Sequence, residues 1–119
     1  MLRITRHPVP WGVVTWSSFH VFANGDAASL VFFGSFLVSG LTVMWLVDRQ
    51  MEASLGADFQ TYAEQTSVLP FAAIARGKNR LVWRELGVKP LLLVLAAFSL
   101  IVSLHPWLFG AYPLPGMDD

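Results

Sequence analysis

The sequence contains no cysteine among its 119 residues. Disulfide bonds, zinc sites held by thiolates and iron–sulfur clusters held by cysteine are therefore excluded. Charge is also scarce, because Asp, Glu, Lys and Arg together make up 13% of the chain and their formal charges cancel at pH 7. This neutral balance gives no reason to expect nucleic acid as a partner.

Apolar residues, in contrast, dominate the composition. They make up 55% of the chain, and the mean hydropathy is +0.54. Both values exceed those of an ordinary small soluble domain, so we expect an integral membrane protein in contact with the lipid bilayer. The length allows two or three spans and one interfacial segment, without room for a separate soluble core. Residues 1–119 are therefore predicted to form a single all-α membrane domain.

Three apolar segments are expected to span the bilayer, at about residues 8–23, 28–47 and 90–105. The second is the clearest, since about 20 helical residues cover about 30 Å, the thickness of the hydrocarbon core. A turn signal at residues 24–26, Asn-Gly-Asp, lies between the first two segments and predicts a helical hairpin. Pro106 is expected to stop the third helix.

Residues 49–89 differ from the spans in character. Met51, Leu55, Phe59 and Tyr62 recur at helical spacing, which predicts an amphipathic helix lying at the membrane surface. A basic cluster precedes the third span and consists of Arg76, Lys78, Arg80, Arg84 and Lys89. The positive-inside rule then places the N-terminus and residues 49–89 in the cytoplasm and the C-terminus outside, and we expect a bacterial inner membrane. No cleavable signal peptide is predicted.

A polar stripe marks the first predicted span. Ser17, His20 and Asn24 recur at helical spacing and share one face with Val13. Because a polar stripe in a membrane helix should face protein or a cofactor, we expect His20 in a crevice between helices. Small residues of the second span, Ala28, Ser35, Ser39 and Thr42, favour close helix packing there.

A neutral imidazole in such a crevice is suited to be an axial ligand of haem, with its other ring nitrogen held by a hydroxyl, an amide or a backbone carbonyl. Ser17 is the candidate partner one turn earlier. The alternative is that His20 only hydrogen-bonds a neighbouring helix. His105 is a candidate second ligand, or an interfacial residue closing a helix. His7 lies at the opposite end of the first span, where contact with lipid headgroups would explain it.

The ordered motifs of nearly the whole chain resemble the C-terminal half of the NnrU family, which includes the zeta-carotene isomerases of plants and cyanobacteria. The residues that carry the resemblance are Arg3–Pro8, Trp16, His20, Asn24, Asp48-Arg49, Leu55-Gly56, Phe59, Thr66–Val68, Pro70–Ile74, Gly77 and His105-Pro106.

This resemblance implies a multi-pass membrane protein that uses haem b in the isomerase branch and converts a central cis double bond of a polyene to trans. The bacterial branch is associated with denitrification and nitrogen-oxide metabolism. The resemblance also implies that His20 is the haem ligand, with Ser17, Asn24, Arg6 and His7 as further cofactor-binding residues. Ser17 replaces a cysteine of the plant isomerases. Family members carry further spans before the arginine motif, so this chain is expected to be either a fragment of a longer protein or one that works with a homo-oligomer or membrane partner supplying those spans.

Two alternatives stay open. Membrane methyltransferases of the isoprenylcysteine and phospholipid type share Arg-His-Pro and a Leu/Phe-Gly, Tyr, Pro pattern, and they bind S-adenosylmethionine. Here Asp48-Arg49 stands where those enzymes carry paired glutamates, which reverses the local charge. The third reading is a non-enzymatic accessory subunit that packs against another membrane protein.

Overall fold

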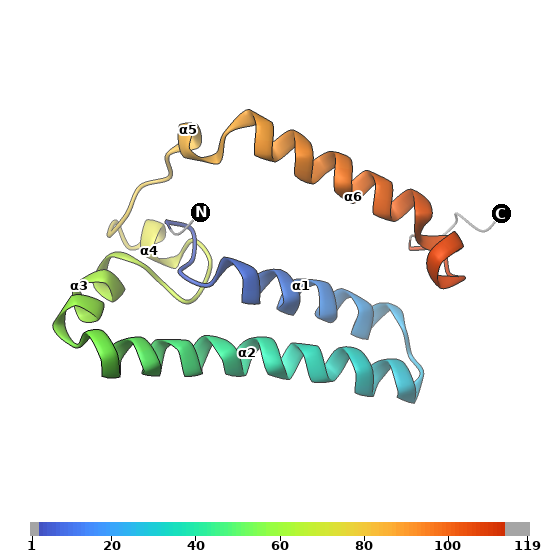
Figure 1. Ribbon diagram of the computed structural model, residues 1–119, viewed down its shortest axis with the longest axis horizontal. Coiled ribbons are helices and arrows are strands. Elements are labelled where there is room, and N and C mark those ends of the chain that lie inside the picture. The colour runs from blue at the N-terminus through green and yellow to red at the C-terminus, as the bar shows by residue number, and fades with distance from the viewer. Residues whose placement is uncertain (1–2, 114–119) are drawn as a thin grey trace. The chain divides into compact units, whose positions relative to one another are not determined.

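The computed structural model describes residues 3–113, and within this range the regular secondary structure is helical, with no strand (Figure 1). The helices are α1 (Pro8–Ala23), α2 (Ala27–Leu55), α3 (Ala57–Gln65), α4 (Ala72–Ala75), α5 (Trp83–Leu86) and α6 (Val88–Phe109). The chain divides into two compact units, residues 1–81 with α1 to α4 and residues 82–119 with α5 and α6. The all-α fold class is confirmed.

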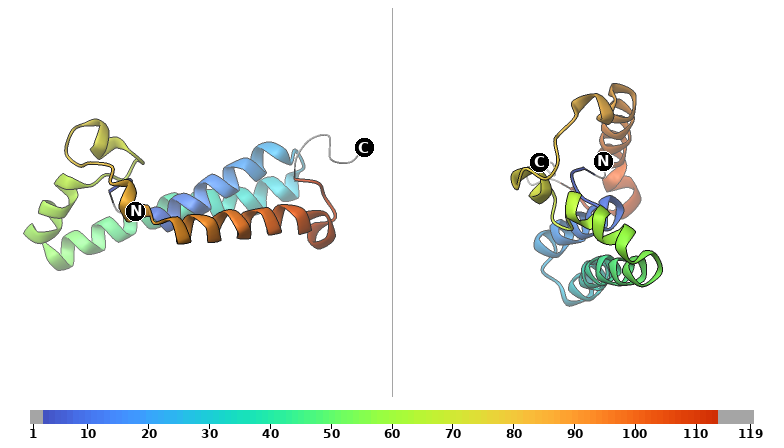
Figure 2. Two further views of the ribbon diagram at one scale, coloured as in Figure 1. Left: turned by 90° about the horizontal axis from the view of Figure 1, so that it is seen from above. Right: turned by 90° about the vertical axis from the view of Figure 1, so that its left-hand side faces the viewer.

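In the first unit, α1 and α2 lie side by side and run in opposite directions (Figures 1 and 2). The predicted turn at residues 24–26 connects them. Asn24 ends α1, since its side-chain amide donates to the carbonyl of His20 at 2.8 Å. Asp26 begins α2 by accepting a hydrogen bond from the Ser29 backbone N–H at 2.9 Å. Hydrogen bonding by Ser29 lowers the pKa of the Asp26 carboxyl below its ordinary value.

Close packing between α1 and α2 depends on a glycine. A Cβ atom built on Gly40 would lie 2.8 Å from the Val14 Cγ2 atom and 3.4 Å from the Pro10 carbonyl oxygen. Val14 and Met44 are the buried apolar residues of this interface, and Ser17 is fully buried. The small residue at the interface is thus Gly40, where only hydrogen fits. The small residues expected there, Ala28, Ser35, Ser39 and Thr42, are instead exposed.

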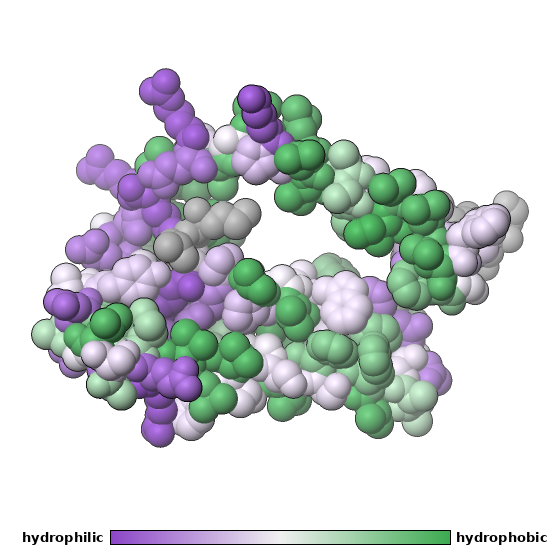
Figure 3. Space-filling model, viewed as in Figure 1, coloured by the Kyte–Doolittle hydropathy of each residue, from purple (hydrophilic) through white to green (hydrophobic). Residues whose placement is uncertain are grey.

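Two of the described helices, α2 and α6, are long and apolar enough to cross a membrane, each with a mean hydropathy of 2.1 in its most apolar stretch. Only 11% and 0% of these stretches are buried in the protein, unlike the core helices of soluble domains. Figure 3 shows hydrophobic side chains along the visible surface of both helices. The two helices suggest a membrane protein. Helix α1, the first of the three predicted spans, has 16 residues and would cover about 24 Å, which is shorter than the hydrocarbon core.

The structure differs from the sequence prediction after residue 47. Helix α2 continues past Asp48 and Arg49 to Leu55, and the single amphipathic helix expected from Met51 to Tyr62 is broken at Gly56. Gly56 has φ +51° and ψ −118°, a conformation open to glycine and strained for other residues. The chain turns there, and α3 folds back so that Phe59 is buried, 7% exposed.

Helix α6 also differs from its prediction. It runs from Val88 through Pro106 to Phe109, so the expected stop at His105 is wrong. Pro106 removes one backbone donor, and the helix continues for one more turn until Gly110 adopts a left-handed conformation. The Gly110 N–H then donates to the Pro106 carbonyl at 2.9 Å.

The segment before α1, residues 3–7, is held by the loop 66–71; we call it the N-terminal strap. Its hydrogen bonds connect parts of the chain more than 60 residues apart. They are Arg6 N–H to Ser67 O (3.0 Å), Phe71 N–H to Ile4 O (2.7 Å) and Thr5 Oγ1 to Val68 O (2.7 Å). The Trp11 indole N–H also donates to Val68 O at 2.7 Å. The strap thereby fixes where α1 begins relative to the loop.

The close approach at Gly40 leads to a stability prediction. Gly40→Ala should lower the stability of the first unit by about 1–3 kcal/mol, because the new methyl group overlaps Val14. Gly34→Ala is the matched control on the same helix, since nothing lies within 4 Å of its Cβ position. Thermal unfolding of the two variants in one detergent measures the difference. Equal midpoints would contradict the packing described for α1 and α2.

Candidate functional site

The first polar cluster joins the N-terminal strap to α2. The Arg6 Nε atom donates to both carboxylate oxygens of Asp48, at 3.0 and 3.1 Å, and the Arg6 Nη2 atom forms an ion pair with the same carboxylate. His7 Nε2 lies 2.8 Å from Asp48 Oδ1. His7 is only 6% exposed. Asp48 thus accepts hydrogen bonds from two consecutive residues of the strap. The short distances and the opposite charges of Arg6 and Asp48 make these hydrogen bonds stronger than those between neutral groups.

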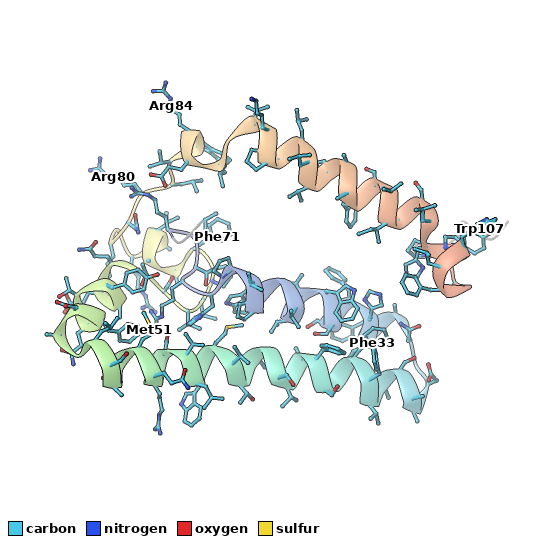
Figure 4. The ribbon with its side chains drawn as sticks, viewed as in Figure 1. Phe33, Met51, Phe71, Arg80, Arg84 and Trp107 are labelled. Carbon is cyan, nitrogen blue, oxygen red and sulfur yellow. The ribbon has the colours of Figure 1, made fainter. Side chains whose placement is uncertain are left out.

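A pocket of about 240 Å³ lies beside this cluster, between the strap, α2 and α3. Its lining residues are Arg6, His7, Val47, Asp48, Met51, Phe59 and Tyr62. The Arg6 guanidinium carbon lies 5.9 Å from the centre of the Phe59 ring, within the range of a cation–π contact. In Figure 4, Met51 points from α2 toward the strap and α3. The pocket therefore combines a polar edge with apolar walls.

His20 occupies a second cluster near the other end of α1. Its ring centre lies 4.9 Å from that of Trp16 and 4.5 Å from that of Phe33 on α2. Trp16 in turn meets Phe33 and Phe36 edge-on, at 5.2 and 5.6 Å. Figure 4 shows Phe33 between the two helices. His20 is half-buried and lies among aromatic rings, which agrees with the expected crevice.

The hydrogen bonds of the polar stripe orient this histidine. His20 Nδ1 lies 2.9 Å from the Trp16 carbonyl oxygen, which can only accept, so Nδ1 carries the proton. In the neutral ring Nε2 then has the lone pair. The Ser17 hydroxyl donates to the backbone carbonyl of Val13 at 2.7 Å and is thus committed to its own helix. The backbone carbonyl of Trp16, and not Ser17, holds the His20 ring.

The sequence-predicted site residues separate into three groups. His20 and Asn24 lie at the end of α1, whereas Arg6 and His7 lie at its start, with Asp48. His20 lies thirteen positions after His7, which corresponds to about 20 Å along a helix. His105 belongs to the second unit, where its Nδ1 lies 2.7 Å from the Ala111 carbonyl oxygen and its ring centre lies 4.8 Å from that of the tilted Phe109 ring. Arg6 and His7 are therefore not part of a site at His20.

The chemistry of His20 fits an axial ligand of haem. A ligating histidine usually donates its other ring N–H to a carbonyl or carboxylate, and Nδ1 does so here. The described residues contain no group of three or more His, Cys, Asp or Glu side chains that could hold a bare metal ion. A porphyrin supplies four of the iron ligands itself, so one imidazole and an aromatic surround are compatible with it.

Sequence reasoning missed the role of Asp48 and the pocket walls Phe59 and Tyr62. The sequence pattern places Asp48 only as the first residue after the second predicted span. One signal was available in the sequence: the predicted hairpin brings the carboxylate of Asp48 to the same end as Arg6 and His7. Both of these residues need a hydrogen-bond acceptor when they are buried. The turn at Gly56, which brings Phe59 and Tyr62 to the pocket, has no comparable periodic signal.

Comparison with known proteins now defines the family. The family described as NnrU protein matches residues 1–113. The chain belongs to the NnrU family. This NnrU chain is 31% identical over 114 residues to the 15-cis-zeta-carotene isomerase, chloroplastic, of Arabidopsis thaliana, a match that covers 93% of the chain and 31% of that protein.

The enzyme of the same name from Zea mays is 33% identical over 81 residues, which cover 68% of the NnrU chain and 22% of the maize protein. The chain spans less than a third of the length of these curated relatives. No solved structure matches it. At the level of the family, these relatives support a function of the carotenoid isomerase type.

The Asp48 cluster gives a second stability prediction. Asp48→Asn should destabilise this NnrU chain by about 1.5–3 kcal/mol, because Arg6 and His7 lose a charged acceptor in a partly buried place. Asp58→Asn, on α3, is the control, since Asp58 is exposed and forms no ion pair with the described residues. Denaturation in detergent followed by circular dichroism compares the two. Equal stabilities would contradict a structural role of Asp48.

Proposed function

We propose that this NnrU chain is the histidine-bearing part of a membrane isomerase that converts a central cis double bond of a carotenoid-type polyene to trans. The observation that carries the proposal is the 31% identity to a 15-cis-zeta-carotene isomerase over 93% of the chain. Because the chain spans less than a third of that enzyme, the remaining spans would come from a membrane partner, a second copy or further sequence.

Haem b is the cofactor that we propose for this activity, with His20 as its axial ligand. Support comes from the Nδ1 hydrogen bond to the Trp16 carbonyl, which holds the ring in the tautomer that a ligating histidine usually has. When bound, haem b would supply an iron centre that exchanges electron density with the conjugated system and lowers its barrier to rotation.

The protein residues around His20 have roles of their own in this proposal. Trp16, Phe33 and Phe36 form an aromatic surface against which a flat, apolar polyene can stack. Phe19 and Phe32 are largely exposed and extend this surface beyond the interface between α1 and α2. An apolar surround of this kind excludes water and offers a hydrocarbon substrate contact without polar groups to desolvate.

The membrane arrangement follows from the same proposal. We propose that α1 and α2 form a hairpin in the bilayer and that α6 crosses it separately. The basic residues of the strap and of the segment 76–89 would place that side in the cytoplasm, or its organellar equivalent. His20 would then lie near the opposite face of the membrane.

Haem binding provides the first test. The chain, purified in detergent and reconstituted with haem b, should show a Soret band that shifts on reduction with dithionite, and His20→Ala should reduce the haem content to background. His105→Ala is the matched histidine control: an unchanged band would assign the axial role to His20, and a shifted band would add His105 as a ligand. A colourless wild-type protein, or full haem retention by His20→Ala, would contradict the proposal.

Isomerisation provides the second test. Membranes containing the wild-type chain, together with the partner or further sequence that supplies its remaining spans, should convert 15-cis-zeta-carotene to the 15-trans isomer in the dark. His20→Ala should lower the rate by at least about 100-fold, a loss of about 2.7 kcal/mol of barrier lowering. Chromatography of the extracted pigments measures both isomers. Conversion no faster than in membranes without the protein, with haem bound, would favour the accessory-subunit reading over an isomerase.

A further inference from the structure

The pocket between the N-terminal strap, α2 and α3 lies about 20 Å from His20 along α1, and the proposed isomerase chemistry does not use it. It is lined by Arg6, His7 and Asp48 on one side and by the apolar side chains of α2 and α3 on the other. Its volume of about 240 Å³ is smaller than that of sites that enclose a whole drug-sized ligand. The pocket therefore suits a single ring or head group.

The charges in the pocket favour an uncharged ligand. The Arg6 guanidinium is already paired with the Asp48 carboxylate, at 3.0 Å from Nε to Oδ1. A phosphate or carboxylate entering the pocket would meet the negative charge of Asp48 as well as the positive charge of Arg6. Because the two charges offset one another, the site offers an anion little net attraction.

The hydrogen-bond donors that line the pocket favour a ligand that accepts hydrogen bonds. Within residues 3–113, Arg6 Nη1 and the Tyr62 hydroxyl form no hydrogen bond, although both residues line the pocket. A guanidinium N–H only donates, and a phenol hydroxyl donates readily to a carbonyl. A ligand that carries carbonyl oxygens would satisfy both groups.

The walls favour a flat ring. The Phe59 and Tyr62 ring centres lie 6.3 Å apart with a tilt of 42°, and Met51 adds a polarizable sulfur beside them. Val47 is the last residue of the apolar run of α2 before Asp48. A ligand with an apolar tail could therefore reach the pocket along α2, with its ring at the polar end and its tail in lipid.

From these observations we propose that this pocket binds the head group of a lipid-soluble quinone. Quinones combine the required features: an uncharged flat ring, two acceptor carbonyls and an apolar tail. Arg6 Nη1 and the Tyr62 hydroxyl donate to the ring carbonyls, and Phe59 and Met51 contact its face. The binding site is separate from the proposed haem site at His20.

The test is titration of the full chain in detergent with decylubiquinone, followed by calorimetry. The wild-type protein should bind saturably. Tyr62→Phe, which removes one hydroxyl without a partner in residues 3–113, should weaken binding about threefold to tenfold. Tyr112→Phe, the other tyrosine of the chain, is the control and should bind as the wild type does.

A second pair of variants tests the pocket itself. Met51→Trp should fill it and reduce quinone affinity at least about tenfold, whereas Leu55→Trp, one turn further along α2 and outside the pocket lining, should not. His20→Ala should bind quinone normally, which separates this proposal from the one for haem. Absence of saturable binding, unchanged affinity in a folded Met51→Trp variant, or tighter binding of decyl phosphate than of decylubiquinone would overturn the proposal.

Discussion

The first unit depends on the hydrogen bonds that the Asp48 carboxylate accepts from the N-terminal strap. Arg6 and His7 both reach this carboxylate, and His7 is nearly buried in doing so. A buried imidazole and a guanidinium without an acceptor would be costly, so Asp48 determines where the strap meets α2. Because α1 begins directly after His7, the same carboxylate also sets the register in which α1 lies along α2.

That register has consequences at the far end of the hairpin. The glycine at position 40 meets Val14, and Phe33 meets His20, only if α1 lies at this height along α2. A polar cluster at one end of two packed helices therefore positions an aromatic cluster about 20 Å away. The two clusters differ in character: one is a hydrogen-bonded ion pair beside a small pocket, and the other is a single imidazole among aromatic rings.

The different character of the two clusters suits a membrane protein that binds two kinds of molecule. The apolar cluster at His20 matches a hydrocarbon substrate and a porphyrin, both of which need contact area more than hydrogen bonds. The pocket at Arg6 offers donors, so it matches a head group with acceptor oxygens. Helix α1 connects the two clusters, and the residues that form them belong to the first unit. The relatives support a function of the carotenoid isomerase type at the level of the family, and the binding of a head group depends on the geometry of the pocket alone.

Periodicity, turn residues and composition were sufficient to predict α1, the turn at residues 24–26 and the apolar run of α2, because each depends on neighbours within a few residues. The ordered motifs also indicated the family. The partnership of Asp48 with Arg6 and His7, the turn at Gly56 and the pocket walls on α3 required the tertiary structure. The Asp48 partnership and the pocket join residues that are far apart in sequence, and the turn depends on one backbone conformation at Gly56. Such features leave no periodic pattern in the sequence.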